Sequence, residues 1–281
     1  MKNILFNQQQ TSAIGIGTWH LGEGNATENN RQMEAIKYGL DHGINLIDTA
    51  EMYGEGLSET LIGKTIKDYP RDKFQLVSKF YPYHATEKLI ETSLKKSLQR
   101  LQTDYLDLYL LHWRGDTPLS ETVTGLEKMV QAGLIKNWGV SNFDLADLKE
   151  LSQLEHGTNC RVNEDLYNIG SRGIEYDILP WQKQHQMSFI GYSPFGSDGG
   201  AYLNIKPVLK EMAQSKNITI HQLLLAWVIR NHDLLSIPKT SSVEHMKSNL
   251  DAIDISFTPD ELELLDQNYP KPNQKTSLET I

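Results

Sequence analysis

The sequence contains a single cysteine, Cys160, in 281 residues, which excludes an internal disulfide and a cysteine metal cluster. Long apolar runs are missing too, because the longest, Leu223–Ile229, is far below the roughly 18 residues that a membrane span needs. The apolar stretch near Met1 is too short for a signal peptide. The chain has 27 basic and 36 acidic residues, which gives a net charge of −9. This charge disfavours binding to nucleic acids and to anionic membranes. We expect a cytoplasmic monomer that binds neither.

Short apolar runs alternate with longer amphipathic stretches along the chain. Helical patterns include Thr86–Leu101, where apolar residues recur at helical spacing, and Thr117–Gly133, which ends in glycine. The apolar runs have the length of buried strands: Ala13–Trp19, Ile44–Asp48, Phe74–Lys79, Leu106–His112, Ile135–Ser141, Cys160–Asp165, Met187–Ser193 and Leu234–Lys239. Such alternation implies parallel strands with helical crossovers, and eight repeats favour a closed α/β fold, the (β/α)8 TIM barrel.

An open doubly wound sheet is the alternative fold. It usually carries a GxGxxG fingerprint after its first strand, and Gly17, Gly22 and Gly24 do not have that spacing. No linker rich in Pro, Gly or Ser divides the chain, so we predict one domain over residues 1–281. We also predict an extra helix over Thr258–Tyr269, followed by a loose tail.

Ionisable side chains end three consecutive predicted strands. Asp48 follows NLI, Lys79 follows QLVS and His112 follows LYLL, while Tyr53 lies on the loop after Asp48. Any one of them alone would be a polar residue leaving the core for solvent. Parallel barrels keep their reactive residues at the carboxyl ends of their strands, so three such residues together indicate a site.

The chemistry of these four residues is that expected of a proton-donating site. The free phenol of tyrosine has a pKa near 10, and the ammonium of Lys79 is expected to lower the pKa of Tyr53. Asp48 would keep the buried lysine charged. His112 would hydrogen-bond the reacting oxygen or share the proton. We therefore predict that Tyr53 is a general acid.

Longer motifs carry a family resemblance across nearly the whole chain. They are IDTAEMYGEGLSE, LVSK, LLHW, GVSNF, GYSPFG and SIPKTSSVEHMKSNL, in this order. Together they resemble the successive motifs of the aldo-keto reductases. The resemblance implies a (β/α)8 barrel that binds NADPH without a Rossmann fold. It also implies carbonyl reduction by a tetrad matched by Asp48, Tyr53, Lys79 and His112.

The resemblance further implies cofactor contacts. Ser141 and Asn142 match residues that hydrogen-bond the nicotinamide carboxamide, and Tyr192 matches the aromatic residue that stacks on the nicotinamide ring. For Tyr192 the competing interpretation is strand packing. The other matched positions are Ser193 and Phe195 along the pyrophosphate, Lys239 and Thr240 at the 2′-phosphate, and Asn249 at the adenine.

Two positions depart from the family pattern. Glu164 stands where the family generally has a glutamine that contacts the carboxamide. An ionised carboxylate accepts hydrogen bonds but cannot donate one, and it would favour the positively charged oxidised nicotinamide. His245 stands where many members place an arginine at the 2′-phosphate. We expect a weaker preference for NADPH, with some use of NADH, and a preference that improves at lower pH, where histidine protonates.

The substrate pocket is expected to be shallow and open, because the loop after His112 and the C-terminal tail are short for the family. Its apolar walls would be Trp19, Met52, Tyr81 and Trp113, although each could instead belong to the core. The stretch Ser171–Trp181 resembles the bacterial branch of methylglyoxal and 2,5-diketogluconate reductases. Small dicarbonyls are therefore the favoured substrates.

Two other functions are compatible with parts of this pattern. The first is an NADPH-binding redox sensor or regulatory barrel with little turnover. The second is a metal-dependent hydrolase that uses His112, Asp48 and His84. Neither HxH nor HExxH occurs among the nine histidines, so no metal is expected.

Overall fold

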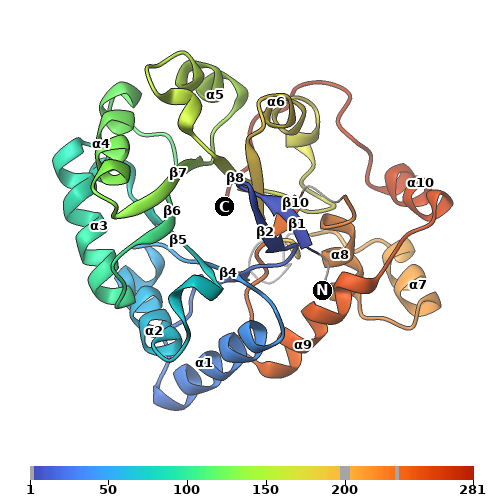
Figure 1. Cartoon of the computed structure of the whole chain (residues 1–281). Coiled ribbons are helices and arrows are strands. Elements are labelled where there is room, and N and C mark those ends of the chain that lie inside the picture. Colours follow the sequence, from blue (N-terminus) through green and yellow to red (C-terminus); the bar gives the residue numbers. More distant parts are fainter. Residues whose placement is uncertain (1–2, 197–202, 232–233) are drawn as a thin grey trace.

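Eight parallel strands surround one axis, and helices surround the strands (Figure 1). The structure is a computed structural model that describes residues 3–196, 203–231 and 234–281. The strands that it describes in the barrel are β3 (Ile16–Gly17), β4 (Leu46–Asp48), β5 (Gln75–Phe80), β6 (Leu106–Leu111), β7 (Ile135–Ser141), β8 (Val162–Leu166), β9 (Ser188–Tyr192) and β10 (Leu234–Ser236). Each pairs in parallel with the next strand along the chain.

The barrel closes between its first and last strands. Parallel bridges join Ile14 to Ser236 and Gly17 to Lys239. A side chain at Gly17 would place its Cβ 2.4 Å from the carbonyl oxygen of Ile237, so only glycine permits this close approach. The predicted (β/α)8 barrel is confirmed, and the open doubly wound sheet is excluded.

Helices follow the strands on the outside of the barrel (Figure 1). The expected helix at Thr86–Leu101 is α3, with Thr86 as its N-cap, and the one at Thr117–Gly133 is α4. The expected extra helix is α10. Their bounds in the described chain are α1 (Ala26–Asp41), α2 (Leu57–Ile66), α3 (Glu87–Leu101), α4 (Leu119–Gln131), α5 (Leu145–Ser152), α6 (Ile178–Gln184), α7 (Pro207–Ser215), α8 (Ile220–Val228), α9 (Val243–Asp251) and α10 (Pro259–Asn268). Within these residues, no helix has both the length and the apolar character needed to cross a membrane.

An N-terminal hairpin, formed by β1 (Asn3–Phe6) and β2 (Gln9–Ser12), was not predicted from the sequence. The backbone amide of Asn7 donates to Ser188 Oγ at the start of β9, and that of Ser12 donates to Asn45 Oδ1 just before β4. The hairpin therefore covers the amino ends of the strands, near the axis in Figure 1. The opposite end of the barrel is left for the site.

The C-terminal tail, for which a loose conformation is predicted, has no helix or strand and is mostly exposed, but some of its residues contact the barrel. Leu278 packs against the hydrophobic core, and Thr276 lies against Gly173. Figure 1 shows the C-terminus near the barrel axis, and Ile281 lines the cavity at that end. The tail thus reaches the barrel mouth, where Ile281 remains 52% exposed.

Candidate active site

A cavity of about 500 Å³ lies at the carboxyl ends of the strands. It contains most of the residues that the sequence singled out. These are Trp19, Asp48, Met52, Tyr53, His112, Trp113, Ser141, Asn142, Glu164, Tyr192, Ser193, Phe195, Lys239, Thr240 and His245. Lys79, Tyr81 and Asn249 were singled out as well but do not line the cavity.

The loop after β4 places Tyr53 beside Asp48. The backbone amide of Glu51 donates to the carbonyl of Lys79, which ties this loop to β5. Tyr53 then begins the 3-10 helix η1 (Tyr53–Gly56). Gly54 and Gly56 adopt positive φ angles of 56° and 90°, which turn the chain sharply into α2. The apolar strand thus ends in a carboxylate, and a glycine-rich turn holds the phenol above it.

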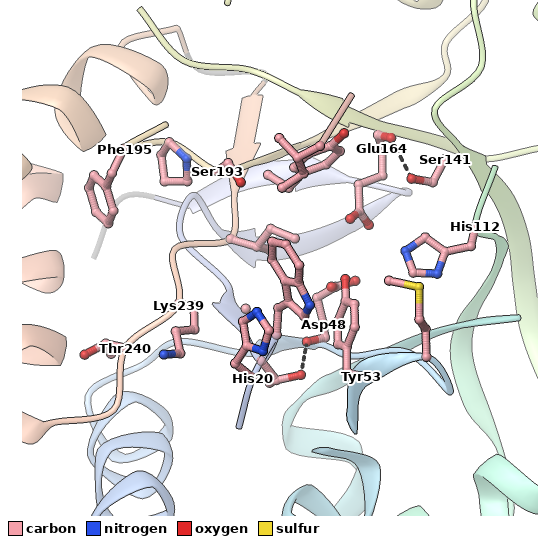
Figure 2. A pocket seen from close by; sticks show the side chains of 18 of the residues that line it. His20, Asp48, Tyr53, His112, Ser141, Glu164, Ser193, Phe195, Lys239 and Thr240 are labelled. Carbon is pink, nitrogen blue, oxygen red and sulfur yellow. Dashed lines mark hydrogen bonds between the residues drawn. The ribbon is translucent and has the colours of Figure 1, made fainter. Parts of the chain in front are cut away.

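Lys79 lies at the centre of a buried polar cluster behind the cavity wall. Its Nζ donates to Asp48 Oδ1 at 2.5 Å and to the hydroxyl of Tyr53 at 3.1 Å. The imidazole of His112 meets the Tyr53 ring edge-on, with 5.8 Å between ring centroids. Figure 2 shows Tyr53, His112 and Glu164 turned toward one space. The structure therefore brings the four predicted catalytic side chains together.

The net effect of these surroundings on Tyr53 is opposite to the predicted one. Burial raises the pKa of the Tyr53 phenol above its usual value, and the negative charge of Asp48 raises it further, as would that of an ionised Glu164. The ammonium of Lys79 lowers it, as expected, but by less than burial raises it. The phenol thus remains protonated at neutral pH and can act as a proton donor.

The charge of Lys79 is secured by two carboxyl groups. Burial opposes the charged form, but Asp48 and then Glu164 outweigh it and raise the pKa of Lys79 well above its usual value. Glu164 Oε1 lies 3.3 Å from Lys79 Nζ. Burial also raises the pKa of Glu164 well above its usual range, with the negative charge of Asp48 as the next cause. These causes favour the protonated form of Glu164, whereas the sequence led us to expect an ionised carboxylate.

His112 is present as a neutral imidazole. Burial, and then the positive charge of Lys79, lower its pKa well below the usual value for histidine. Its Nδ1 is buried without a hydrogen-bond partner among the described residues. A neutral ring can offer one donor and one acceptor to a bound oxygen without a full charge.

Polar groups from three strand ends continue the cavity wall beyond the tetrad. Asn142, with a positive φ of 56°, donates from Nδ2 to the His112 carbonyl and accepts from the Tyr192 hydroxyl at 2.7 Å. Ser141 Oγ donates to the carbonyl of Glu164 across the sheet. These bonds fix Asn142 and Tyr192 as neighbours on one wall.

The far end of the cavity carries Phe195, Lys239 and Thr240 (Figure 2). Lys239 is exposed, and among the described residues it forms no ion pair with a carboxylate. Its ammonium is therefore free to contact an anion. Glu164 Oε2 is buried without a partner in the part of the chain that the structure describes. A free ammonium at one end of the cavity and unpaired hydrogen-bonding groups at the other are compatible with an elongated anionic ligand.

Three residues proposed for binding or chemistry lie elsewhere. Tyr81 stacks on Tyr83, with 4.6 Å between ring centroids, and Asn249 lies near the end of α9. His84 Nδ1 lies 2.8 Å from Glu51 Oε1, outside the cavity lining. Within the described ranges, no group of three His, Cys, Asp or Glu side chains could hold a metal ion. The hydrolase set is thus not assembled.

Several lining residues were not anticipated. His20 is adjacent to Trp19 and stacks on it, with 4.6 Å between ring centroids. Its place in the stretch GTWH, next to a predicted pocket residue, could have indicated that it lines the cavity. Nothing in the sequence pattern pointed to Ile281. The other lining residues that were not predicted to line a site are Gly17, Thr18, Pro194, Gly196, Ile237 and Ser241.

The fold and the site define a (β/α)8 barrel in which a buried lysine hydrogen-bonds a tyrosine at the carboxyl ends of the strands, an arrangement suited to proton donation. The chain belongs to the Aldo/keto reductase family, whose model matches residues 13–270. The family expected from the motifs is therefore confirmed.

Individual relatives agree with this assignment. The chain is 43% identical over 271 residues to methylglyoxal reductase YeaE of Escherichia coli (strain K12), covering 96% of this chain and 95% of that protein. An aldo/keto reductase of Klebsiella pneumoniae, solved with NADP and acetate, superposes with a TM-score of 0.95 at 45% identity, covering 100% of this chain and 99% of the other. A structure from the same organism with NADPH gives the same TM-score, identity and coverage.

Proposed function

We propose that this protein reduces small aldehydes, ketones and dicarbonyls, methylglyoxal among them, with NADPH as hydride donor. The observation that carries the proposal is the hydrogen bond between Lys79 and Tyr53 beside a cavity of about 500 Å³ at the carboxyl ends of the strands. Relatives of high identity are a methylglyoxal reductase and a reductase solved with NADP and with NADPH.

The chemistry divides between cofactor and protein. Bound NADPH would supply a hydride to the carbonyl carbon. Tyr53 donates its proton to the oxygen as negative charge develops there, and the ammonium of Lys79 stabilises the phenolate that remains. His112 offers a neutral hydrogen bond to the same oxygen. Trp19, Met52 and Trp113 supply flat or apolar surface around the substrate, which suits small carbonyls.

The direct test follows loss of NADPH absorbance with methylglyoxal and a panel of aldehydes, ketones and sugars. Rapid turnover of dicarbonyls supports the proposal. Tight NADPH binding without turnover of any carbonyl would contradict it and support the sensor instead. Absence of NADPH binding would contradict both. The same preparation, run on size-exclusion chromatography, tests the expectation of a monomer, and fractionation of the source cells tests the expectation of a cytoplasmic protein.

A further inference from the structure

Two carboxyl groups share one ammonium at the base of the cavity. Lys79 Nζ lies 2.5 Å from Asp48 Oδ1 and 3.3 Å from Glu164 Oε1, and the three side chains are 0%, 1% and 2% exposed. If both carboxyl groups were ionised, a net negative charge would be left in a site that water barely reaches. Burial of an uncompensated charge is strongly unfavourable, so the cluster favours retention of one additional proton.

The second oxygen of each carboxyl group shows where that proton fits. Asp48 Oδ2 and Glu164 Oε2 are both buried, and neither has a partner among the described residues. Both carboxyl groups contact the same ammonium, at 2.5 and 3.3 Å, so the two side chains lie close to each other. Two carboxylates cannot form a hydrogen bond, whereas a carboxylic acid and a carboxylate can. The proton belongs on Glu164, because Asp48 has the shorter contact with the ammonium.

We propose that Glu164 carries this proton in the resting enzyme and releases it to solvent when the oxidised dinucleotide binds, so that preference for the oxidised cofactor grows with pH. The inference rests on the proposed function, because it takes NADP(H) as the ligand. The only bond that breaks is the O–H bond of Glu164, and the proton leaves through the cavity that this residue lines.

The location of Glu164 explains why the two redox forms should differ. Its carbonyl accepts from Ser141 Oγ at 2.9 Å, and it lies on the wall expected to meet the nicotinamide carboxamide. A protonated carboxyl can donate and accept, as a glutamine amide does, so it suits the neutral reduced ring. The oxidised ring is positively charged and would add to Lys79 in favouring the carboxylate.

Other titratable groups lie near Glu164, and their influence on cofactor binding must be distinguished from that of Glu164 itself. Burial leaves the imidazole of His112 neutral and the phenols of Tyr53 and Tyr192 protonated, so Lys79 is the cation of the cluster. All of these groups remain in a Glu164→Gln variant. The facing groups and their elements are Asp48 on β4, Tyr53 on η1, Lys79 on β5, His112 after β6 and Tyr192 on β9.

The test measures Kd for NADP⁺ and for NADPH by tryptophan fluorescence, from about pH 6 to 9, the range above an ordinary carboxyl pKa. In the wild type, the ratio of the two constants should shift toward NADP⁺ by up to about tenfold per pH unit, the limit for one linked proton. In Glu164→Gln the ratio should stay flat. Groups that contact the 2′-phosphate act on both cofactors alike, so their effect cancels in the ratio.

Glu150→Gln is the matched control, because it removes one carboxylate from the surface of α5, where Glu150 is 52% exposed. It should behave as the wild type does. If Glu164→Gln fails to fold, calorimetry of the wild type in buffers of different ionisation enthalpy counts protons directly. More proton release with NADP⁺ than with NADPH supports the inference.

Equal proton release, or a wild-type ratio as flat as that of Glu164→Gln, would overturn the inference while leaving the proposed function intact. Failure to bind either dinucleotide would overturn the proposed function itself. The two failures are therefore distinguishable in one set of titrations.

Discussion

The ammonium of Lys79 lies 3.1 Å from the hydroxyl of Tyr53, and the lysine is completely buried. At this distance the positive charge acts on the phenolate with little screening by water. It stabilises the anion that remains after proton transfer more than the neutral phenol before it. The pair therefore favours the charge distribution of the transition state over that of the resting enzyme.

Tyr53→Phe removes the proton and keeps the ring. We expect kcat with methylglyoxal to fall by about 10²- to 10⁴-fold, the usual contribution of a general acid, while Kd for NADPH changes little. Steady-state kinetics and fluorescence titration check the two parts. Tyr176→Phe, which removes a hydroxyl from an exposed ring outside the cavity, should leave kcat unchanged. A Tyr53→Phe enzyme as fast as the wild type would mean that another group is the acid.

Most of the barrel was predictable from periodicity. The predicted strand Ile135–Ser141 has the bounds of β7, and Leu106–His112 exceeds β6 by one residue. The last strand was predicted to end at Lys239, but β10 ends at Ser236. Pro238 has no N–H to donate, and beyond Ser236 the chain joins β3 only through the isolated bridge between Lys239 and Gly17. Barrel closure decides these ends, and closure is a tertiary property.

The missed hairpin had a local signal. Ile4 and Phe6 are buried while Leu5 between them is exposed, the alternation of a half-buried strand. Asn7 and Gln8 follow with positive φ angles of 45° and 63°, as two-residue hairpin turns require. Asparagine tolerates this conformation, but glutamine does so rarely, which weakened the turn signal in the sequence.

The sequence was enough to predict which residues form the site, but not how these residues interact across the barrel. Glu164 was expected to be a cofactor contact, yet it lies 3.3 Å from Lys79, on a strand that is not adjacent to β5. Contacts between non-adjacent strands depend on side chains that meet inside the barrel, which spacing along the chain does not reveal. The degree of burial that governs the pKa of Tyr53 was hidden for the same reason.

Asp48→Asn tests what keeps Lys79 charged. Asp48 raises the pKa of Lys79 against the effect of burial, so its loss lets that pKa fall. We expect the fall of kcat at high pH to begin at a lower pH than in the wild type. Above that point kcat should decrease about tenfold per pH unit. Asp254→Asn, at an exposed position, should keep the wild-type profile. An unchanged alkaline limb would show that Asp48 does not maintain the ammonium.

His245→Arg tests the 2′-phosphate end of the cavity. His245 lies in the first turn of α9 and lines the cavity, so an arginine there would add a fixed charge and a fork of donors. A charge-assisted hydrogen bond is worth about 1.5–3 kcal/mol, so selectivity for NADPH over NADH should rise roughly tenfold or more. Gln267→Arg, which adds the same charge at an exposed position on α10, should not change it. An NADPH over NADH selectivity that stays the same in His245→Arg would exclude this position from recognition of the phosphate.

Glu164→Gln should change how the cofactor-free protein responds to pH. The pKa of Glu164 is raised in the folded state by burial and by Asp48, so the native protein holds a proton that the unfolded chain has lost. Stability therefore falls as pH rises from the unfolded carboxyl value, about 4.3, toward the raised folded value. Glutamine has no proton to lose. The stability of the variant relative to the wild type should therefore increase as the pH rises through this range. Each kcal/mol gained would raise Tm by about 2 °C or more, measurable by differential scanning calorimetry.

The sign of this effect separates two descriptions of Glu164. A carboxylate stabilised by Lys79 would have a lowered pKa, and its removal would cost more stability at pH 8 than at pH 5. A retained proton gives the reverse, with Glu164→Gln relatively more stable at pH 8. Glu150→Gln should show no such crossover, since its carboxylate is exposed. Parallel melting curves for the wild type and Glu164→Gln at both pH values would contradict the retained proton without reference to any cofactor.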